Sequence, residues 1–215
     1  MSDSTDTLAS AVDLAFDLQG GSLPREHRRE LAAALAAALP WLPGVPGAAV
    51  HRLNVSAGGG PQALLSQRTR LTLRVPRERA GDATVLSGQC LQVAGCTLQV
   101  GAAHTRELLP HGALYAHFVA ASDADGAAGS DAADEAAFQR DVQAQLAALG
   151  VTGRLICGRH QVVEGGALQG YGLMLDGLAR THALRVLEAG LGPHRLLGCG
   201  VFVPHKSAAA VGTPP

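Results

Sequence analysis

The sequence predicts an α+β protein made of two consecutive units, each with the order strand, helix, strand, strand, helix, strand. Three observations lead to this prediction. Apolar and polar residues alternate with a period of two in several short segments, which is typical of strands buried on one face. Apolar residues recur every three or four positions in other segments, which indicates amphipathic helices. The same succession of segments occurs twice within the 215 residues.

The first unit is predicted to extend over residues 11–100. A strand over residues 11–18 comes first, because apolar residues occupy every second position. A helix over 24–39 follows, which begins at a proline and carries Leu31, Leu35 and Leu39 on one side. The remaining predicted elements are a strand over 47–54, a strand over 65–75, a short helix over 76–86 and a hairpin over 91–100 that turns at Ala94-Gly95.

The second unit is predicted to extend over residues 101–206 and to repeat this order. Its predicted elements are a strand over 113–120, a helix over 134–149, strands over 153–163 and 168–175 joined at Glu164-Gly165-Gly166, a helix over 180–189 and a strand over 197–203. This order is that of the split βαβ motif, so we predict two tandem ferredoxin-like (RRM-like, βαββαβ) units. Residues 1–10 and 207–215 are expected to be flexible tails, and 121–133 a mobile loop.

The composition is that of a folded domain without a membrane span. Apolar residues make up 47% of the chain and charged residues 16%, which argues against disorder. No run approaches the 18 or so apolar residues that a membrane helix needs, and the acidic start lacks a leader pattern. The four cysteines show no C-x-x-C spacing. We therefore expect a cytoplasmic protein that uses no structural metal and no cofactor.

The near-neutral total charge of −1 conceals a strong asymmetry along the chain. Residues 20–80 carry a net charge of +6 and residues 153–206 a net charge of +3, whereas residues 81–152 carry −6. The basic parts of both predicted units could share one face. This distribution is expected of a protein that binds a polyphosphate.

Three arginines of the predicted strand over 65–75, Arg68, Arg70 and Arg74, share one strand face with only Thr and Ser between them. Each guanidinium can bind two phosphate oxygens. A solvated outer face is the alternative. The absence of a neighbouring acid in the sequence favours phosphate binding.

A glycine-rich segment between the last helix and the last strand contains His194 and Arg195. Its glycines are Gly190, Gly192, Gly198 and Gly200. Glycines allow backbone N–H groups and a cation to approach one phosphate closely. The segment lacks the Gly-Lys-Ser/Thr ending of a nucleotide-binding P-loop and follows a helix, so we do not expect it to bind a nucleoside triphosphate.

His27 is the first candidate for proton transfer among nine histidines. It lies in the first turn of the predicted helix, beside Arg28, where the helix dipole and the neighbouring cations favour the neutral imidazole. A neutral imidazole can accept a proton near pH 7. His51, next to Arg52 on the following strand, is a second candidate.

Several motifs together resemble a known family. They are Leu23-Pro24 followed by His27, the segment Leu39-Pro40-Trp41-Leu42, His51, the segment from Leu65 to Leu71, Gly170-Tyr171-Gly172-Leu173, and the block from Gly190 to Pro204. Over residues 11–206 the chain resembles the CRISPR-associated endoribonucleases of the repeat-associated mysterious protein superfamily, in the branch of the MYXAN subtype. The glycine-rich block is the most specific part of this resemblance.

The resemblance implies a metal-independent endoribonuclease that binds the stem-loop of CRISPR repeat RNA and cuts the precursor RNA. A base removes the proton of a ribose 2′-hydroxyl, and the products carry a 2′,3′-cyclic phosphate and a 5′-hydroxyl. The family's histidine corresponds to His27, with His51 as an alternative or assisting residue. Arg28, Arg195, His194 and the glycine-rich loop would bind RNA, with Arg68, Arg70 and Arg74 on its flanking backbone. Many relatives pair the histidine with a tyrosine or lysine, and the only lysine here is Lys206.

Two other functions remain open at this point. One is a subunit of a CRISPR effector complex that binds the repeat hairpin and cuts it weakly or not at all. Such a subunit would contact other proteins of the complex. The other is a ferredoxin-like sensor of a small ligand, for which the arginine-rich strand and the glycine-rich loop have no purpose.

Overall fold

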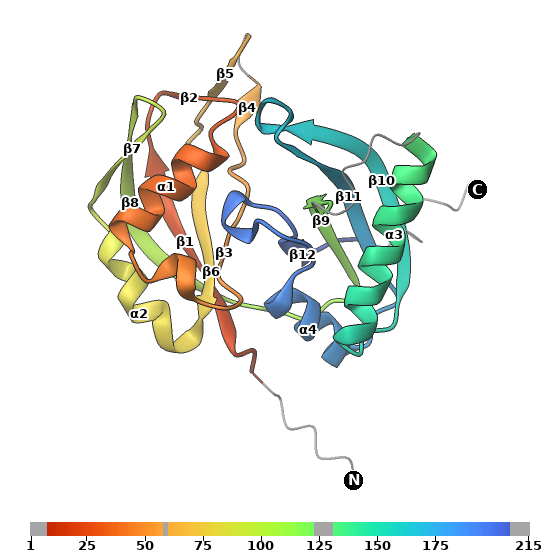
Figure 1. The fold of residues 1–215 in the computed structure, drawn as a ribbon. Coiled ribbons are helices and arrows are strands. Elements are labelled where there is room, and N and C mark those ends of the chain that lie inside the picture. The colour runs from red at the N-terminus through yellow and green to blue at the C-terminus, as the bar shows by residue number, and fades with distance from the viewer. Residues whose placement is uncertain (1–7, 58–59, 123–130, 207–215) are drawn as a thin grey trace, which may run out of the picture.

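The structure of the protein is a computed structural model, and it describes residues 8–57, 60–122 and 131–206. Two units, each with a sheet covered by helices, lie side by side (Figure 1). Residues 123–130 and 207–215, parts of a predicted mobile loop and tail, lie outside the described residues, as do residues 1–7.

The first unit is a five-stranded antiparallel sheet with the order β3-β6-β1-β8-β7. Its strands are β1 (Ala11–Gln19), β3 (Ala49–Val50), β6 (Arg70–Pro76), β7 (Cys90–Val93) and β8 (Cys96–Glu107). Its helices are α1 (Arg28–Ala38), α2 (Ala80–Ala83) and the 3-10 turns η1 (Leu42–Gly44), η2 (Arg77–Arg79) and η3 (Thr84–Leu86). The strand β8 pairs with β1 up to Glu107, so the first sheet extends past residue 100.

The core of the first unit follows from the period-two pattern of its strands. The side chains of Leu14 and Phe16 on β1 and of Leu71 and Leu73 on β6 are at most 1% exposed. They pack in one cluster with Leu31 and Leu35 of α1, and with Leu39 just beyond it. The other face of the sheet carries the charged side chains.

The second unit is a four-stranded antiparallel sheet with the order β10-β11-β9-β12. Its elements are β9 (Ala113–Ala120), α3 (Asp131–Ala148), β10 (Arg154–Val163), the 3-10 turn η5 (Glu164–Gly166), β11 (Leu168–Asp176), α4 (Arg180–Ala189), the 3-10 turn η6 (Arg195–Leu197) and β12 (Phe202–Pro204). The helices α3 and α4 pack on one face of this sheet, where their apolar side chains meet those of β9 and β11. Both sheets have the strand order of a ferredoxin-like unit, so the predicted fold class is confirmed.

A third, small sheet with the order β2-β5-β4 lies beside the two units (Figure 1). Its strands are β2 (Ser22–Pro24), β4 (Ser56–Ala57) and β5 (Gln62–Leu64). The side chain of Leu23 on β2 is fully buried and anchors the chain directly before α1. This sheet therefore sets the position at which α1 begins.

Four local predictions are wrong because contacts between distant segments override local patterns. Pro24 lies in β2, and α1 begins only at Arg28. The strand predicted over 65–75 begins at Arg70, and that over 47–54 is reduced to Ala49–Val50. The last strand is β12, preceded by η6 where its first residues were predicted.

Candidate active site between the two units

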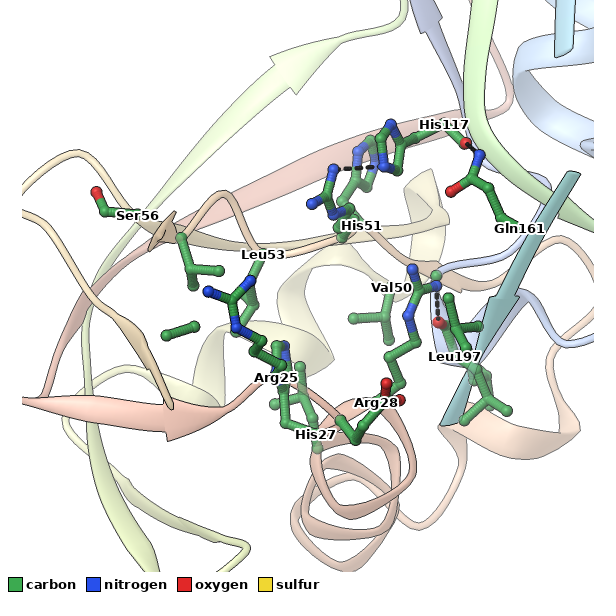
Figure 2. Close-up of a pocket in the computed structure, with 18 residues that line it drawn as sticks. Arg25, His27, Arg28, Val50, His51, Leu53, Ser56, His117, Gln161 and Leu197 are labelled. Atoms are coloured by element: carbon green, nitrogen blue, oxygen red, sulfur yellow. Dashed lines mark hydrogen bonds between the residues drawn. The ribbon is translucent and has the colours of Figure 1, made fainter. Parts of the chain in front are cut away.

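A cavity of about 320 Å³ lies between the two units (Figure 2). The first unit lines it with the end of β2, the start of α1 and the segment after β3, and the second unit with β9, β10 and η6. Its polar and charged lining residues are Arg25, Glu26, His27, Arg28, His51, Arg52, Ser56, His117 and Gln161. Three histidines and three arginines therefore surround one inter-unit cleft.

His27 lies at the wall of this cleft as the N-cap residue of α1, and its side chain is only 7% exposed. Its carbonyl accepts the first hydrogen bond of the helix from Leu31 N. Its Nδ1 lies 2.6 Å from the carbonyl oxygen of Pro24, which can only accept. Nδ1 therefore carries the proton, and in the neutral ring Nε2 holds the free electron pair that a general base needs.

Arg28 joins the two units at the floor of the cleft. Its Nη1 donates to the carbonyl of Leu197 at 3.0 Å, and its backbone N–H donates to Glu164 Oε1 at 3.1 Å. Its guanidinium also lies 5.5 Å from the centre of the Phe118 ring. The predicted RNA-binding residue Arg28, which belongs to the first unit, is thus held in the cleft by contacts with the second unit.

Arg52 and His117 form a second pair in the cleft, which the sequence did not reveal as functional. Arg52 Nη1 donates to His117 Nε2 at 2.6 Å (Figure 2). Burial lowers the pKa of His117, and the charges of Arg52 and Arg28 lower it further. His117 is therefore neutral near pH 7, and its Nε2 is occupied as an acceptor. Tyr115 and His117 on one strand face were the available signal, but 65 residues separate Arg52 from His117 in sequence.

His51 also lines the cleft, but its ring meets a carboxylate of the first unit. Its Nε2 lies 3.2 Å from Asp13 Oδ1, without the alignment of a hydrogen bond. Burial lowers the pKa of His51, and this effect outweighs the opposing influence of Asp13. Burial raises the pKa of Asp13, but contacts with His51 and Arg74 together hold it well below its usual value.

Arg74 was predicted to lie on an open strand face, but the structure buries its side chain. Its side chain is 1% exposed, and Nε and Nη2 donate to the two carboxylate oxygens of Asp13 at 2.7 and 2.9 Å. Its Nη1 donates to the carbonyls of Leu187 and Phe202 in the second unit at 2.7 and 3.0 Å. The expected place of Arg74 on an open, phosphate-binding strand face is therefore corrected, because this guanidinium is enclosed between the units.

Arg70 has an acidic partner in the sheet, whereas Arg68 lies outside the strand. Arg70 Nε lies 2.9 Å from Asp17 Oδ1, because β1 and β6 pair Asp17 with Arg70 and Asp13 with Arg74. Arg68 lies in the turn before β6 and is exposed. The spacing of four residues in both the acidic and the basic pair was the signal that could have revealed these contacts.

In the glycine-rich loop, Arg195 points to the inter-unit junction and His194 is exposed. Arg195 Nη2 donates to the carbonyl of Gly47 at 3.0 Å, while Nε and Nη1 are buried without a hydrogen bond. Burial and the charge of Arg74 lower the pKa of Arg195 to about 10. The guanidinium is thus still charged at pH 7, and the half-buried side chain is held at the junction by the Gly47 carbonyl. His194 adopts a left-handed conformation with φ 65°.

The four glycines of the loop serve its packing. The Gly190 N–H donates to Val186 O and the Gly192 N–H to Gln145 Oε1. The Gly198 N–H donates to Arg195 O and the Gly200 N–H to Phe118 O. The prediction that these N–H groups are free for a phosphate is therefore wrong. A Cβ at Gly200 would lie 1.7 Å from Leu191 O, and one at Gly190 1.9 Å from Arg195 Nη1. All four residues have positive φ, so the loop needs glycine for both space and conformation.

Gly200→Ala is expected to destabilise the protein by about 2–3 kcal/mol, because overpacking adds to the cost of positive φ. Gly177→Ala is the matched control: Gly177 also has positive φ, at 71°, but nothing lies within 4 Å of its Cβ position. We expect this control to cost about 1 kcal/mol. Urea unfolding measures both, and equal losses would contradict a packing role for Gly200.

Three further findings concern the cysteines, metal ligands and membrane spans. All four cysteines are free thiols, and within the described ranges no three or more His, Cys, Asp or Glu side chains are grouped as metal ligands. No helix in the part of the chain that the structure describes is long and apolar enough to cross a membrane.

The fold places the chain in the class of proteins built from two tandem ferredoxin-like units. Arginines and histidines line the cleft between its two units. The family model described as "Cas6 Crispr" matches residues 12–207. The "CRISPR-associated endonuclease Cas6" of Myxococcus xanthus (strain DK1622) is 36% identical over 202 residues, which cover 93% of this chain and 84% of that protein. The chain therefore belongs to the Cas6 family of CRISPR-associated proteins, as the motifs had suggested.

Solved structures agree at the level of the fold. A "CRISPR associated protein Cas6" matches with a TM-score of 0.64 at 12% identity, covering 91% of this chain and 100% of that chain. "An RAMP protein binding different RNA substrates" matches with a TM-score of 0.61 at 14% identity, covering 89% and 98%. A Cas6-related protein from Pyrococcus furiosus has a TM-score of 0.58 at 11% identity, covering 90% and 98%.

Proposed function

We propose that this protein is an endoribonuclease that binds CRISPR repeat RNA and cuts it by attack of a ribose 2′-hydroxyl on the adjacent phosphate. The observation that carries the proposal is His27 at the wall of a cationic cleft, with Nδ1 held by the Pro24 carbonyl and Nε2 left as the proton acceptor. Membership of the Cas6 family and a relative named as an endonuclease support it.

In the proposed reaction, His27 Nε2 takes the proton of the 2′-hydroxyl. The 2′-oxygen forms a bond to phosphorus as the bond from phosphorus to the 5′-oxygen breaks. The 5′-oxygen takes up a proton from water, and the His27 imidazolium returns its proton to the resulting hydroxide. The products are a 2′,3′-cyclic phosphate and a 5′-hydroxyl. The nucleophile belongs to the RNA and the base to the protein, so this step needs no metal ion.

Arg28 and Arg52 would stabilise the added negative charge on the phosphorus oxygens in the transition state. Both guanidiniums line the cleft and are held by contacts to the second unit, Arg28 by Leu197 and Arg52 by His117. Such contacts reduce the reorganisation needed when charge develops. His117 Nε2 already accepts a hydrogen bond from Arg52, and His51 Nε2 lies 3.2 Å from the carboxylate of Asp13. We therefore assign the base to His27, with His51 as the alternative.

The test is incubation with the CRISPR repeat RNA of the same genome in excess EDTA. We expect a cut whose upstream product ends in a cyclic phosphate, detected by its resistance to periodate until acid opens the ring and phosphatase removes the phosphate. A matched RNA with 2′-deoxyribose at the cut position should bind equally and stay intact.

Cleavage of the 2′-deoxy RNA, or cleavage that appears only with a divalent ion, would contradict this mechanism. Tight binding without any cut would favour the alternative of a hairpin-binding subunit in an effector complex.

A further inference from the structure

The sheet of the second unit has one face that no helix among residues 8–57, 60–122 and 131–206 covers. On the opposite face, Phe138 and Val142 of α3 pack against Leu173 and Leu175 of β11. On the helix-free face, the strand register aligns one side chain from each of the four strands in a single row. The row consists of Ile156, Met174, Tyr115 and Val203. All four are partly exposed or exposed, so this is an apolar row outside the core.

Three rings line up along this face, and the first of them lies in the cleft. The Tyr115 ring is 6.3 Å from the His117 ring, edge to face, and 5.5 Å from the His205 ring, tilted by 52°. His117 lines the cleft, and His205 follows β12. The rings therefore extend continuously from the candidate active site across β9 to the edge strand.

Gly172 on the neighbouring strand allows Tyr115 to lie close to the sheet. A Cβ at Gly172 would be 3.2 Å from the Tyr115 hydroxyl and 3.5 Å from Gln161 Nε2. Any larger residue would thus press on the tyrosine. Because Gly172 has no side chain, the Tyr115 ring can lie over β11 and no side chain projects from Gly172 beside the ring.

Cationic and hydrogen-bonding groups stand at both ends of the row of rings. At the cleft end are Arg52, which donates to His117, and Gln161, whose Nε2 donates to the His117 carbonyl at 3.0 Å. At the other end lies the exposed Lys206, next to His205. Phosphates could be bound at both ends, and the faces of the rings between them would be left for stacking.

We propose that this face, centred on Tyr115, is a binding site for an unpaired stretch of RNA whose bases stack on the Tyr115 and His205 rings. A four-stranded sheet with exposed aromatic residues is a known type of platform for single-stranded RNA, and stacking needs no particular base. Continuity with the cleft makes this stretch the one that flanks the cut. The inference rests on the proposed function, because it assumes that RNA occupies the cleft.

The test measures stacking directly. The probe is an oligoadenylate about ten nucleotides long that contains one fluorescent 2-aminopurine, compared with an abasic chain of equal length and charge. Stacking on Tyr115 is expected to quench the fluorescence, and the oligoadenylate should bind more tightly than the abasic chain. Tyr115→Leu should weaken oligoadenylate binding about tenfold and leave abasic binding unchanged.

Tyr115→Phe is the conservative variant and should keep binding within about twofold, because it keeps the ring. Leu109→Ala, which shortens an apolar side chain that is 68% exposed in another part of the chain, should have no effect. Circular dichroism and thermal unfolding check that each variant folds. If Tyr115→Leu binds both probes as the unmodified protein does, or loses affinity for both equally, the stacking site is refuted.

This result is separate from that of the proposed function. Cleavage of repeat RNA by the unmodified protein tests the function, whereas base-dependent binding of the oligoadenylate tests the face. Cleavage without base-dependent binding refutes only the stacking site, and would leave a protein partner as the occupant of this face. Base-dependent binding without cleavage refutes only the nuclease.

Discussion

His27→Ala is expected to slow cleavage of repeat RNA about 100- to 10,000-fold, the range that general acid–base catalysis typically contributes. RNA affinity should stay within about twofold, because the arginines of the cleft remain and electrostatic contacts dominate binding. Single-turnover cleavage and filter binding measure the two quantities. The physical reason is that the Pro24 carbonyl fixes the proton on Nδ1, so Nε2 of this residue is left with the electron pair that the proposed base needs.

His104→Ala is the matched control, because His104 is an exposed histidine on β8 that does not line the cleft. It should cleave at the rate of the unmodified protein. His27→Asn, which can still donate to Pro24 from its amide, separates loss of the base from local rearrangement at the start of α1. Full cleavage by His27→Ala, together with loss of cleavage in His51→Ala, would transfer the role of base to His51.

Arg74→Met is expected to lower the free energy of unfolding by about 3–5 kcal/mol, the typical cost of removing one partner of a buried ion pair. Methionine keeps much of the apolar stem but leaves Asp13 and two carbonyls of the second unit without their donor. Urea unfolding monitored by circular dichroism measures the loss. The large effect is expected because Arg74 is 1% exposed and joins the two units.

Arg70→Met is the control on the same strand. Arg70 pairs with Asp17 at the surface, where both side chains are more than one-third exposed, so its loss should cost less than about 1 kcal/mol. Equal losses in the two variants would contradict a special role for Arg74.

The pH dependence of unfolding gives a second measure of the Arg74 contact. The folded protein holds the pKa of Asp13 below its value in the unfolded chain, about 3.9. The stability from this carboxylate is therefore present above that value and is lost as the pH falls below it. In Arg74→Met the loss of stability on acidification should be smaller, because the carboxyl loses a cationic partner and its pKa in the folded protein moves back toward that of the unfolded chain.

Elements with a strong local pattern were predicted closely. The strand Ala113–Ala120 and the helix Arg180–Ala189 have the predicted bounds, because burial of one side imposes periods of two and of 3.6 on their sequences. The start of α1 was predicted too early. Pro24 suits a helix start, but in the structure it belongs to β2 and pairs with Gln62 of β5. That pairing joins segments 38 residues apart, and no local pattern reports it.

The candidate site was predicted in part. His27, His51 and Arg28 all line the cleft, as their place around the first helix and the following strand suggested. Arg52 and His117 entered the site only through the packing of the two units. The arginines of β6 were misjudged, because in sequence they have no acid beside them, while in the sheet Asp13 and Asp17 lie directly opposite.

By itself the sequence determined the repeated order of strands and helices, and with it the tandem ferredoxin-like fold, because hydrophobic periodicity is a property of neighbouring residues. It also determined which segments are basic. Only the tertiary structure decided which cations line the cleft. Strand register and the contact between units bury Arg74, hold the half-buried Arg195 against Gly47 and leave Arg28 and Arg52 in the cleft, and both depend on residues far apart in the chain.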